Sequence, residues 1–297
     1  MTEKNIQIFG EVLFDHFPDG SCVLGGAPFN VAWHLQAFGQ EPCFISRVGR
    51  DQTGETVKQA MLDWQMDLSG LQRDIEHPTG AVQVSIEDGE PSYLIVPEQA
   101  YDFIEAKELP PVQHQGLLYH GTLALRHDVS RKALLKLKQQ HRGHVFMDVN
   151  LREPWWNTDD VLALVDSVDW VKLNHHELQA LQANMPDLHS GMSHFLQQHR
   201  LSGLVVTRGE QGAIAINAAG EVAEVAPTRS LNIVDTVGAG DAFASVLMLG
   251  IHLDWPLLTT LDRAQAFASA LVGCRGATVR DRSFYLRFID DWQLPTQ

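Results

Sequence analysis

The chain has 297 residues, which suffice for one large α/β domain with a small appendage but not for three ordinary domains. Its composition, 44% hydrophobic and 20% charged, is that of a soluble globular protein. The formal net charge of −15 argues against nucleic acid or an acidic membrane surface as a partner, because both bind a basic face.

Further exclusions concern export, membranes and disulfides. The N-terminal segment combines a single lysine with an early Asp15, which is not the pattern of a signal peptide. No apolar run reaches the ~18 residues that a membrane helix requires. Cys22, Cys43 and Cys274 have no metal-type spacing, and we interpret them as free thiols. We therefore expect a cytoplasmic protein with no membrane segment.

The N-terminal part alternates strands with helices. We expect a strand at residues 5–10, a helix from Pro28 to Gly39, a strand at 43–49 and a helix at 54–66. Two short alternating segments, at 12–17 and 22–24, interrupt this order around a Pro-Asp-Gly turn.

A second interruption begins at Thr79, where apolar and polar residues alternate on both sides of an Asp88-Gly89 turn. Together with the earlier segments, this hairpin predicts a small sheet, formed by about 11–25 and 79–99, that stands off the main domain as a lid. Its apolar face must cover the substrate, another subunit or both. We expect a homodimer through this lid.

From residue 116 onward strands and helices alternate regularly. The expected strands are at 116–123, 144–150, 170–174 and 201–207, followed by a hairpin at 213–226. The expected helices are at 130–141, 159–165, 175–184, 191–198, 242–250 and 261–273. This alternation implies a mainly parallel sheet with helices on both faces, and ligands beyond the carboxyl ends of the strands. We treat residues 1–297 as a single domain.

The sharpest motif is Asp-Thr-Val-Gly-Ala-Gly-Asp at residues 235–241. It follows a strand-like segment at 232–234 and opens an apolar helix. Gly238 and Gly240 let backbone N–H groups converge at the helix N-terminus, which suits the charge on a transferring phosphoryl group. Asp241 can then accept the proton of a hydroxyl aimed at the same point.

Other interpretations of this motif compete with phosphoryl transfer. An ordinary glycine-rich turn with Asp241 as a helix cap would use the same residues. A dinucleotide fingerprint needs a third glycine in an early βαβ unit and an acidic residue about 20 positions on, where the chain offers only Asp262. No Walker GxxxxGK[ST] occurs, which excludes a P-loop phosphotransferase of the usual form.

Two segments resemble the signatures of the ribokinase-like (PfkB) carbohydrate kinases. Residues 235–243, DTVGAGDAF, resemble the carboxy-terminal signature, and residues 25–32, GGAPFNVA, with VGRD at 48–51 and Gly54, resemble the amino-terminal one. The match covers essentially the whole chain. It implies a ribokinase-like three-layer α/β/α domain with a β-sheet lid, which transfers the γ-phosphoryl group of ATP to a sugar hydroxyl.

The resemblance also implies roles at the point of transfer. Asp241 would be the catalytic base, with Gly238, Ala239 and Gly240 as the anion hole. The residues implied for sugar binding are Asp15, Gly25, Gly26, Asn30, Arg152 and Asp241. Arg152 closes a D-x-N-x-R motif at 148–152 and would bridge the transferred phosphate and the sugar. Asp15 could instead be a strand-edge carboxylate, Asn30 a plain helix residue and Arg152 part of a surface salt bridge.

For the nucleotide, the resemblance implies contacts from Asn174, Thr207, Gly209, Gly212 and Gly240. A simple hairpin entry would use the same glycines at 209 and 212.

Two cations are implied in the same way. Asn174 and Glu177 form an N-x-x-E motif, in which Glu177 would organise hydrated Mg²⁺. Asp235 would lie near a K⁺ ion, although the loop at 275–278 lacks the customary proline. His175 and His176 do not share a helix face, so we do not expect them to bind a metal.

Three stretches, at 91–104, 119–134 and 148–152, are most similar to bacterial fructokinases. We therefore expect an ATP-dependent kinase for D-fructose, with ketodeoxygluconate kinase, ribokinase and nucleoside kinase as alternatives. The basic residue that some relatives carry ahead of Ala100 is absent, which favours a neutral sugar. A non-catalytic sugar-binding regulator, which would be free to lose Asp241, and a dinucleotide oxidoreductase are the alternatives from other classes.

Overall fold

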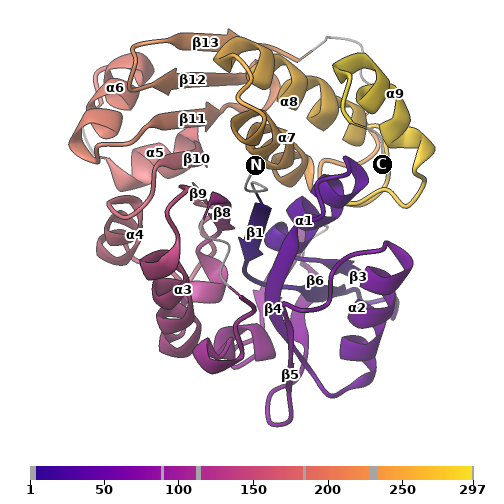
Figure 1. Cartoon of the computed structure of the whole chain (residues 1–297). Helices are drawn as coiled ribbons and strands as arrows, with labels where there is room; N and C mark the ends of the chain where they lie inside the picture. The colour runs from indigo at the N-terminus through magenta and orange to yellow at the C-terminus, as the bar shows by residue number, and fades with distance from the viewer. Residues whose placement is uncertain (1–4, 88–89, 112–114, 183–184, 228–232, 296–297) are drawn as a thin grey trace.

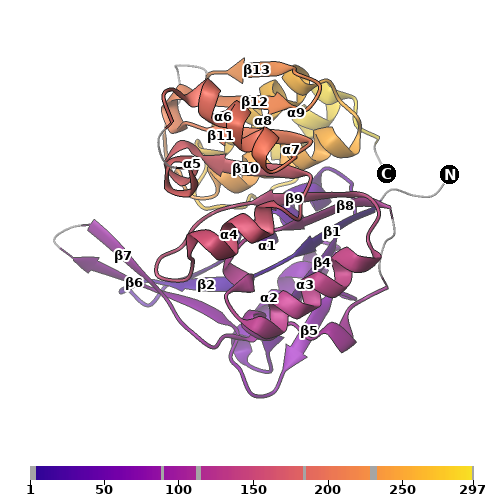
Figure 2. The same ribbon diagram turned by 90° about the vertical axis from the view of Figure 1, so that its left-hand side faces the viewer.

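The computed structural model describes residues 5–87, 90–111, 115–182, 185–227 and 233–295. These residues form a large sheet between two layers of helices and a second, small sheet (Figures 1 and 2). The predicted three-layer α/β/α class with a separate small sheet is therefore confirmed.

The large sheet has nine strands in the order β13-β12-β11-β10-β9-β8-β1-β4-β5. Neighbours from β5 to β11 run parallel, and β12 and β13 add an antiparallel edge. The central strands are continuous apolar runs because helices cover both of their faces. The strands are β1 (Asn5–Phe9), β4 (Cys43–Gly49), β5 (Leu71–Asp74), β8 (Gly116–His120), β9 (His144–Asp148), β10 (Trp170–Asn174), β11 (Gly203–Thr207), β12 (Ala213–Asn217) and β13 (Val222–Val225).

Two apolar clusters fill the space between this sheet and its helices. One contains side chains of α1, α2, α7, α8 and α9, the other those of α3, α4, α5 and α6, and Figure 1 shows these two groups on opposite sides. The helices are α1 (Ala27–Ala37), α2 (Gln52–Asp63), α3 (Asp128–Gln140), α4 (Thr158–Val165), α5 (His175–Leu181), α6 (Leu188–Gln198), α7 (Ala239–His252), α8 (Leu257–Leu271) and α9 (Ser283–Trp292). Short 3₁₀ helices are η1 (Ala100–Phe103), η2 (Ala106–Glu108), η3 (Leu123–Leu125) and η4 (Gly209–Gln211).

The small sheet has the order β3-β2-β6-β7, and its β6–β7 end projects from the body in Figure 2. Its strands are β2 (Leu13–His16), β3 (Cys22–Gly25), β6 (Gly80–Glu87) and β7 (Glu90–Ile95). The expected Asp88-Gly89 turn lies outside the described residues.

The two faces of this small sheet differ. Leu13, Val82 and Ile95 pack with Tyr101 and Leu123 of the main domain. By register Asp15 lies opposite Val82 and Val23, and strand alternation places it on the same face as Leu13. The face that covers the main domain therefore also carries the carboxylate expected to bind sugar.

Several expected boundaries were wrong. Residues 233 and 234 are not a strand, because the Val234 N–H donates to the Val272 carbonyl at the end of α8 and holds the segment as a loop. Residue 232 lies outside the described part of the chain. Helix α6 begins earlier than expected, because Asp187 caps the N–H of Ser190. Helices α7 and α8 likewise begin at residues 239 and 257, and α5 ends at 181 rather than 184.

Among the described strands and α-helices, two were not expected at all. Strand β5 carries only one apolar residue, Leu71, and is held by parallel pairing with β4. Helix α9 buries Tyr285 and Phe288 against Phe267 of α8, a helical spacing that the sequence shows but that we overlooked.

Among the described residues no helix combines the length and the apolar character needed to cross a membrane. The three cysteines are unpaired thiols, as expected.

Candidate active site

The expected site residues gather where the parallel strands end and where α1 and α7 begin. Asn30 of α1 and Asp241 of α7 are 211 positions apart, yet Asn30 Nδ2 donates a 2.7 Å hydrogen bond to Asp241 Oδ2. Asn30 Oδ1 is buried and has no partner among the described residues. The packing of α1 against α7 thus brings the two sequence signatures into contact.

The electrostatic surroundings of Asp241 make it unusually basic for an aspartate. Burial raises the pKa of its carboxyl to about 6, and the Asp148 carboxylate adds to the rise, while Asn30, Lys172 and Arg152 lower it. At neutral pH the group is ionised but holds a proton more readily than an exposed aspartate. That combination is what a general base requires.

The loop that leads into α7 is shaped by glycine. Gly238 is the N-cap with a left-handed φ of 78°, and a Cβ there would lie 2.4 Å from Ala277 Cα. Ala239 and Gly240 are the first residues of the helix, where N–H groups lack intrahelical acceptors. The Ala239 N–H reaches the Thr236 carbonyl at 3.3 Å. With the helix dipole, this turn is an electropositive end suited to an anion.

Asp235 fastens this loop to a second one. Its Oδ1 accepts from the Val237 N–H and its Oδ2 from the Gly276 N–H, each at 3.0 Å. Ala277, against which Gly238 packs, belongs to the same turn. The segments 235–238 and 275–278 therefore form one unit.

A buried ion pair that we did not predict lies beside this unit. Lys172 Nζ is 2.8 Å from both carboxylate oxygens of Asp148, its register partner on β9. Burial alone would lower the pKa of Lys172, but Asp148 raises it above its ordinary value, so the pair is charged. The ammonium is 3.8 Å from where a Cβ of Gly240 would lie. The sequence did offer a signal for this pair, because each of these two apolar strands carries one charged residue, acidic in one strand and basic in the other.

The residues expected to bind sugar lie around the same point. Burial raises the pKa of Asp15, and Arg152 lowers the pKa of both Asp15 and Asp241, so its exposed guanidinium acts on both carboxyls. Gly26 has a φ of 109°, and a Cβ would lie 2.7 Å from the Glu11 carbonyl oxygen, whereas Gly25 has only an ordinary contact with Asp15. The chain thus requires glycine at 26 but not at 25.

Glu11 is a second residue that the sequence analysis missed. It is 3% exposed, and its Oε2 has no hydrogen-bond partner among the described residues. Burial raises its pKa to about 7, its own backbone N–H lowers it, Asp241 raises it, and Arg152 and Arg126 lower it. The sequence signal for Glu11 was its position as a charged residue directly after the apolar strand expected at residues 5–10.

Asn174 and Glu177 form a reciprocal cap at the start of α5. Asn174 Oδ1 accepts from the Glu177 N–H at 2.9 Å, and Glu177 Oε2 accepts from the Asn174 N–H at 2.7 Å. Glu177 Oε1 also accepts from the Leu151 N–H at 2.9 Å, which fixes the loop that carries Arg152. The described residues contain no cluster of three metal-ligating side chains.

The expected nucleotide residues lie one strand further along. Thr207 is the register partner of Asn174. Gly209 is the first residue of the η4 turn between β11 and β12 and Gly212 follows its last residue, where a Cβ would lie 1.9 Å from the Val225 carbonyl oxygen. The hairpin therefore requires Gly212, whatever it binds.

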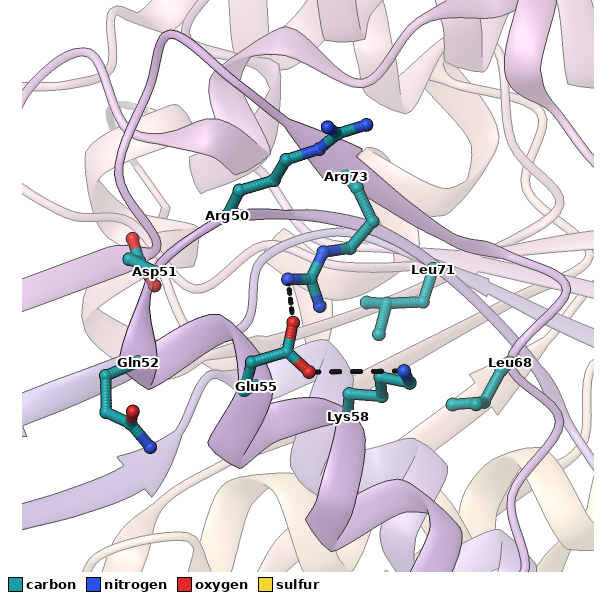
Figure 3. Close-up of a pocket in the computed structure, with 8 residues that line it drawn as sticks. All are labelled: Arg50, Asp51, Gln52, Glu55, Lys58, Leu68, Leu71 and Arg73. Carbon is teal, nitrogen blue, oxygen red and sulfur yellow. Dashed lines mark hydrogen bonds and ion pairs between the residues drawn. The ribbon is translucent and has the colours of Figure 1, made fainter.

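Part of the amino-terminal signature is structural. Asp51 caps α2 through the Gly54 N–H and also accepts from the N–H and hydroxyl of Thr79, where the lid hairpin begins. Beside it, a surface pocket of about 560 Å³ is lined by eight residues (Figure 3). Both of its carboxylates are already engaged, Glu55 with Arg73 and Lys58, and Asp51 with Gly54 and Thr79.

A buried carboxylate of raised pKa in the first turn of a helix, an electropositive turn beside it and nearby cationic side chains suit phosphoryl transfer to a hydroxyl group. Comparison with protein families agrees. Residues 2–282 match the model described as pfkB family carbohydrate kinase, and the chain belongs to that family.

The curated relatives include a fructokinase and a riboside kinase. A fructokinase of Klebsiella pneumoniae is 31% identical over 263 residues, which cover 83% of this chain and 84% of the relative. An aminoimidazole riboside kinase of Salmonella typhimurium is 30% identical over 264 residues, which cover 84% of this chain and 76% of the relative.

Solved structures show the same similarity. Fructokinase from Vibrio cholerae O395 in its fructose-, ADP- and calcium-bound form has a TM-score of 0.84 at 25% identity, covering 96% of this chain and 99% of its own. A double mutant of that fructokinase with fructose, ADP and potassium has a TM-score of 0.82 at 26% identity, covering 96% and 98%. The chain is accordingly an enzyme that phosphorylates a sugar hydroxyl, and the oxidoreductase and regulator alternatives are rejected.

Proposed function

We propose that this chain is an ATP-dependent fructokinase in which Asp241 takes the proton of the attacking sugar hydroxyl. The observation that carries the proposal is the hydrogen bond between Asn30 and Asp241 at the N-terminus of α7. This hydrogen bond joins a carboxylate of raised pKa, beside a turn suited to phosphate, to the start of the helix that follows strand β3 of the small sheet.

Sugar binding is assigned to Asp15, Gly25, Gly26 and Asn30. Asn30 donates to Asp241 through Nδ2, so its buried, unpartnered Oδ1 is left to accept from a sugar hydroxyl. Asp15 belongs to the lid face that covers the main domain, and its two oxygens can accept from neighbouring hydroxyls.

Phosphoryl transfer is assigned to Gly238, Ala239, Gly240 and Asp241. The sugar oxygen forms a bond to the γ-phosphorus, its proton passes to Asp241, and the bond from the γ-phosphorus to the bridging oxygen breaks to release ADP. The N–H groups of the turn, with Lys172 behind Gly240 and Arg152 at the open side, stabilise the charge on the transferring group.

The nucleotide is assigned to the neighbouring strand ends. Asn174 and Thr207 lie side by side on β10 and β11, and Gly209 and Gly240 leave the backbone open to phosphates and ribose, while Gly212 is assigned to the nucleotide through the turn that it closes. Gly209 has nothing within 4 Å of where its Cβ would lie, so space for a ligand exists there.

Mg²⁺ fits this site as a hydrated ion held mainly by the nucleotide. The described residues offer no three-ligand cage, and both oxygens of Glu177 already accept backbone N–H groups, which leaves it to bond water. Mg²⁺ commonly keeps several waters and binds through substrate phosphates. When bound, it would neutralise charge on the phosphates that this acidic chain cannot neutralise alone.

A K⁺ ion is proposed near Asp235. Each oxygen of this carboxylate accepts one N–H at 3.0 Å and keeps a further lone pair, and the two loops it joins are those that shape the turn before α7. A potassium ion is present in one of the similar fructokinase structures.

The test is a coupled assay with MgATP against D-fructose, D-ribose, adenosine, aminoimidazole riboside and ketodeoxygluconate. We expect D-fructose to give the highest kcat/KM. A higher value for a riboside would replace the fructokinase assignment with a nucleoside-type kinase, and a higher value for ketodeoxygluconate would make Arg152 its carboxylate partner.

A further inference from the structure

Glu11 lies at the junction of the two sheets. It lies two residues after the end of β1 in the large sheet and two residues before the start of β2 of the lid. Its backbone carbonyl packs against Gly26 of the amino-terminal signature, 2.7 Å from where a Cβ would be. Glu11 therefore lies between the two sheets and against the N-cap of α1, and its carboxyl is within electrostatic range of Asp241 of α7.

The carboxyl of Glu11 is buried without being satisfied. The residue is 3% exposed, and its Oε2 has no hydrogen-bond partner among the described residues. A buried polar atom without a partner costs free energy unless a ligand or water completes it. A structural carboxyl elsewhere in this chain, Asp74, has its oxygens occupied by Arg47 and backbone N–H groups.

The charges that surround Glu11 come from several elements. Asp241 of α7 disfavours its ionisation, and Arg152 after β9 and Arg126 after η3 favour it. Arg126 is already engaged by both oxygens of Asp102 and by the Val96 carbonyl, and Arg152 is exposed. The buried phenols of Tyr101 and Tyr119 also lie within its electrostatic range.

We propose that Glu11 is a further sugar-binding residue, which keeps its proton while Asp241 is ionised and donates a hydrogen bond from its carboxyl group to an oxygen of the sugar. Two neighbouring carboxyls in a partly desolvated site do not ionise together cheaply, so one of them holds a proton. Because Asp241 must be free to accept a proton, Glu11 is the one that stays neutral. The inference rests on the proposed role of Asp241 but not on which sugar is bound.

Two variants separate this role from a structural one. Glu11→Gln keeps the shape and a donor at all pH values, whereas Glu11→Leu removes the donor and fills the same space without a buried polar atom. Asp74→Asn is the matched control, a buried carboxyl away from the site. Binding is measured by calorimetry without turnover, using whichever sugar of the panel gives the highest kcat/KM with the wild type.

We expect Glu11→Leu to weaken sugar binding about five- to tenfold, the worth of one hydrogen bond, with ATP binding unchanged. Glu11→Gln should bind sugar within about threefold of the wild type. The wild-type affinity should fall as pH rises through about 7, where Glu11 loses its proton, and Glu11→Gln should lack this fall.

Unchanged sugar affinity in Glu11→Leu would overturn the proposal, and so would an equal loss in Glu11→Gln, which would show that the carboxylate charge matters instead. If D-fructose does not give the highest kcat/KM, only the substrate assignment is contradicted, because the binding comparison of the Glu11 variants then uses the sugar that does.

Discussion

Asp241 differs from a helix-capping aspartate in the partner of its carboxylate. The hydrogen bond it accepts comes from the Asn30 side chain on another helix, and the N-cap position belongs to Gly238. A capping role would have directed the oxygen to a backbone N–H of the same turn. This arrangement favours the interpretation of Asp241 as a base over the glycine-turn alternative.

The pH dependence of catalysis follows from this residue. With a pKa of about 6, Asp241 is protonated and unable to act as a base at low pH. We expect kcat/KM for the sugar to fall about tenfold per pH unit below pH 6, and to fall again above about pH 7, where Glu11 loses its proton. A profile that stays flat down to pH 4.5, measured on protein shown to be folded there, would contradict this assignment.

The buried pair of Lys172 and Asp148 provides a test of stability. Lys172→Met leaves Asp148 buried without its partner, and we expect the free energy of unfolding to fall by about 3–5 kcal/mol. The double variant Lys172→Met/Asp148→Leu should recover most of that loss. Lys58→Met, which breaks an exposed pair with Glu55, is the control and should cost less than about 1 kcal/mol. The free energy of unfolding is measured in urea. If Lys172→Met and Lys58→Met lowered it equally, burial of the Lys172–Asp148 pair would not matter.

At the scale of elements, the turn before α7 depends on a neighbouring turn. Gly238 and Gly220 both have positive φ, at 78° and 83°, but only Gly238 has a close neighbour, Ala277 at 2.4 Å from its Cβ position. An alanine at either position would strain the backbone, but only an alanine at 238 would also displace the loop, so comparing the two variants distinguishes these effects.

We expect Gly238→Ala to lower kcat by about 10²-fold, because the Cβ pushes the turn away from Ala277 and misplaces the N–H groups. Gly220→Ala should lose only about 1 kcal/mol of stability from strain and keep its kcat. The check is steady-state kinetics with the melting temperature of each variant. Similar kcat values for both would refute the role of this contact.

The elements that the sequence predicted best are those with local signals. The small sheet followed from alternation around residues 12–24 and 80–96, and the parallel sheet from repeated apolar runs. Strand β5 could not be predicted, because its stability comes from pairing with β4 rather than from its own four residues. Likewise, the loop at 233–234 looked like a strand because its apolar residues suggested burial, but Ile233 is 61% exposed.

The parts of the candidate site that belong to a sequence motif could be predicted, whereas the parts that depend on burial could not. The glycine turn and Asp241 were evident from their spacing. Glu11, Lys172 and Asp148 were visible as charged residues in or beside apolar strands, but their partners became evident only from three-dimensional neighbours. The contact between Asp235 and Gly276 joins positions 41 apart, which no local pattern specifies.

At the scale of the whole molecule, the lid leaves apolar side chains exposed. Val23, Tyr93 and Leu94 are 43%, 56% and 60% exposed on a sheet that is too small to be stable by itself. By register Val23 and Tyr93 lie on the face of Asp15, whereas Leu94 lies on the opposite face of the small sheet.

We still predict a homodimer in which a second copy of the chain covers exposed apolar residues of the lid. We expect light scattering at micromolar concentration to show a dimer, and Leu94→Lys to weaken it at least about tenfold without changing the melting temperature of the monomer. Glu41→Lys, a charge change outside the lid, is the control. A strict monomer for the wild type would contradict the homodimer.

The central claim is that Asp241 removes the proton from the sugar hydroxyl, and Asp241→Asn tests it most directly. Asparagine keeps the size of the side chain and an oxygen that can accept from Asn30 Nδ2, but it cannot take the proton. Phosphoryl transfer is measured as kcat with saturating MgATP and sugar, and binding of each by calorimetry. The account predicts a kcat lower by about 10²–10⁴-fold with affinities changed only a few-fold. A folded variant with near-normal kcat would contradict it.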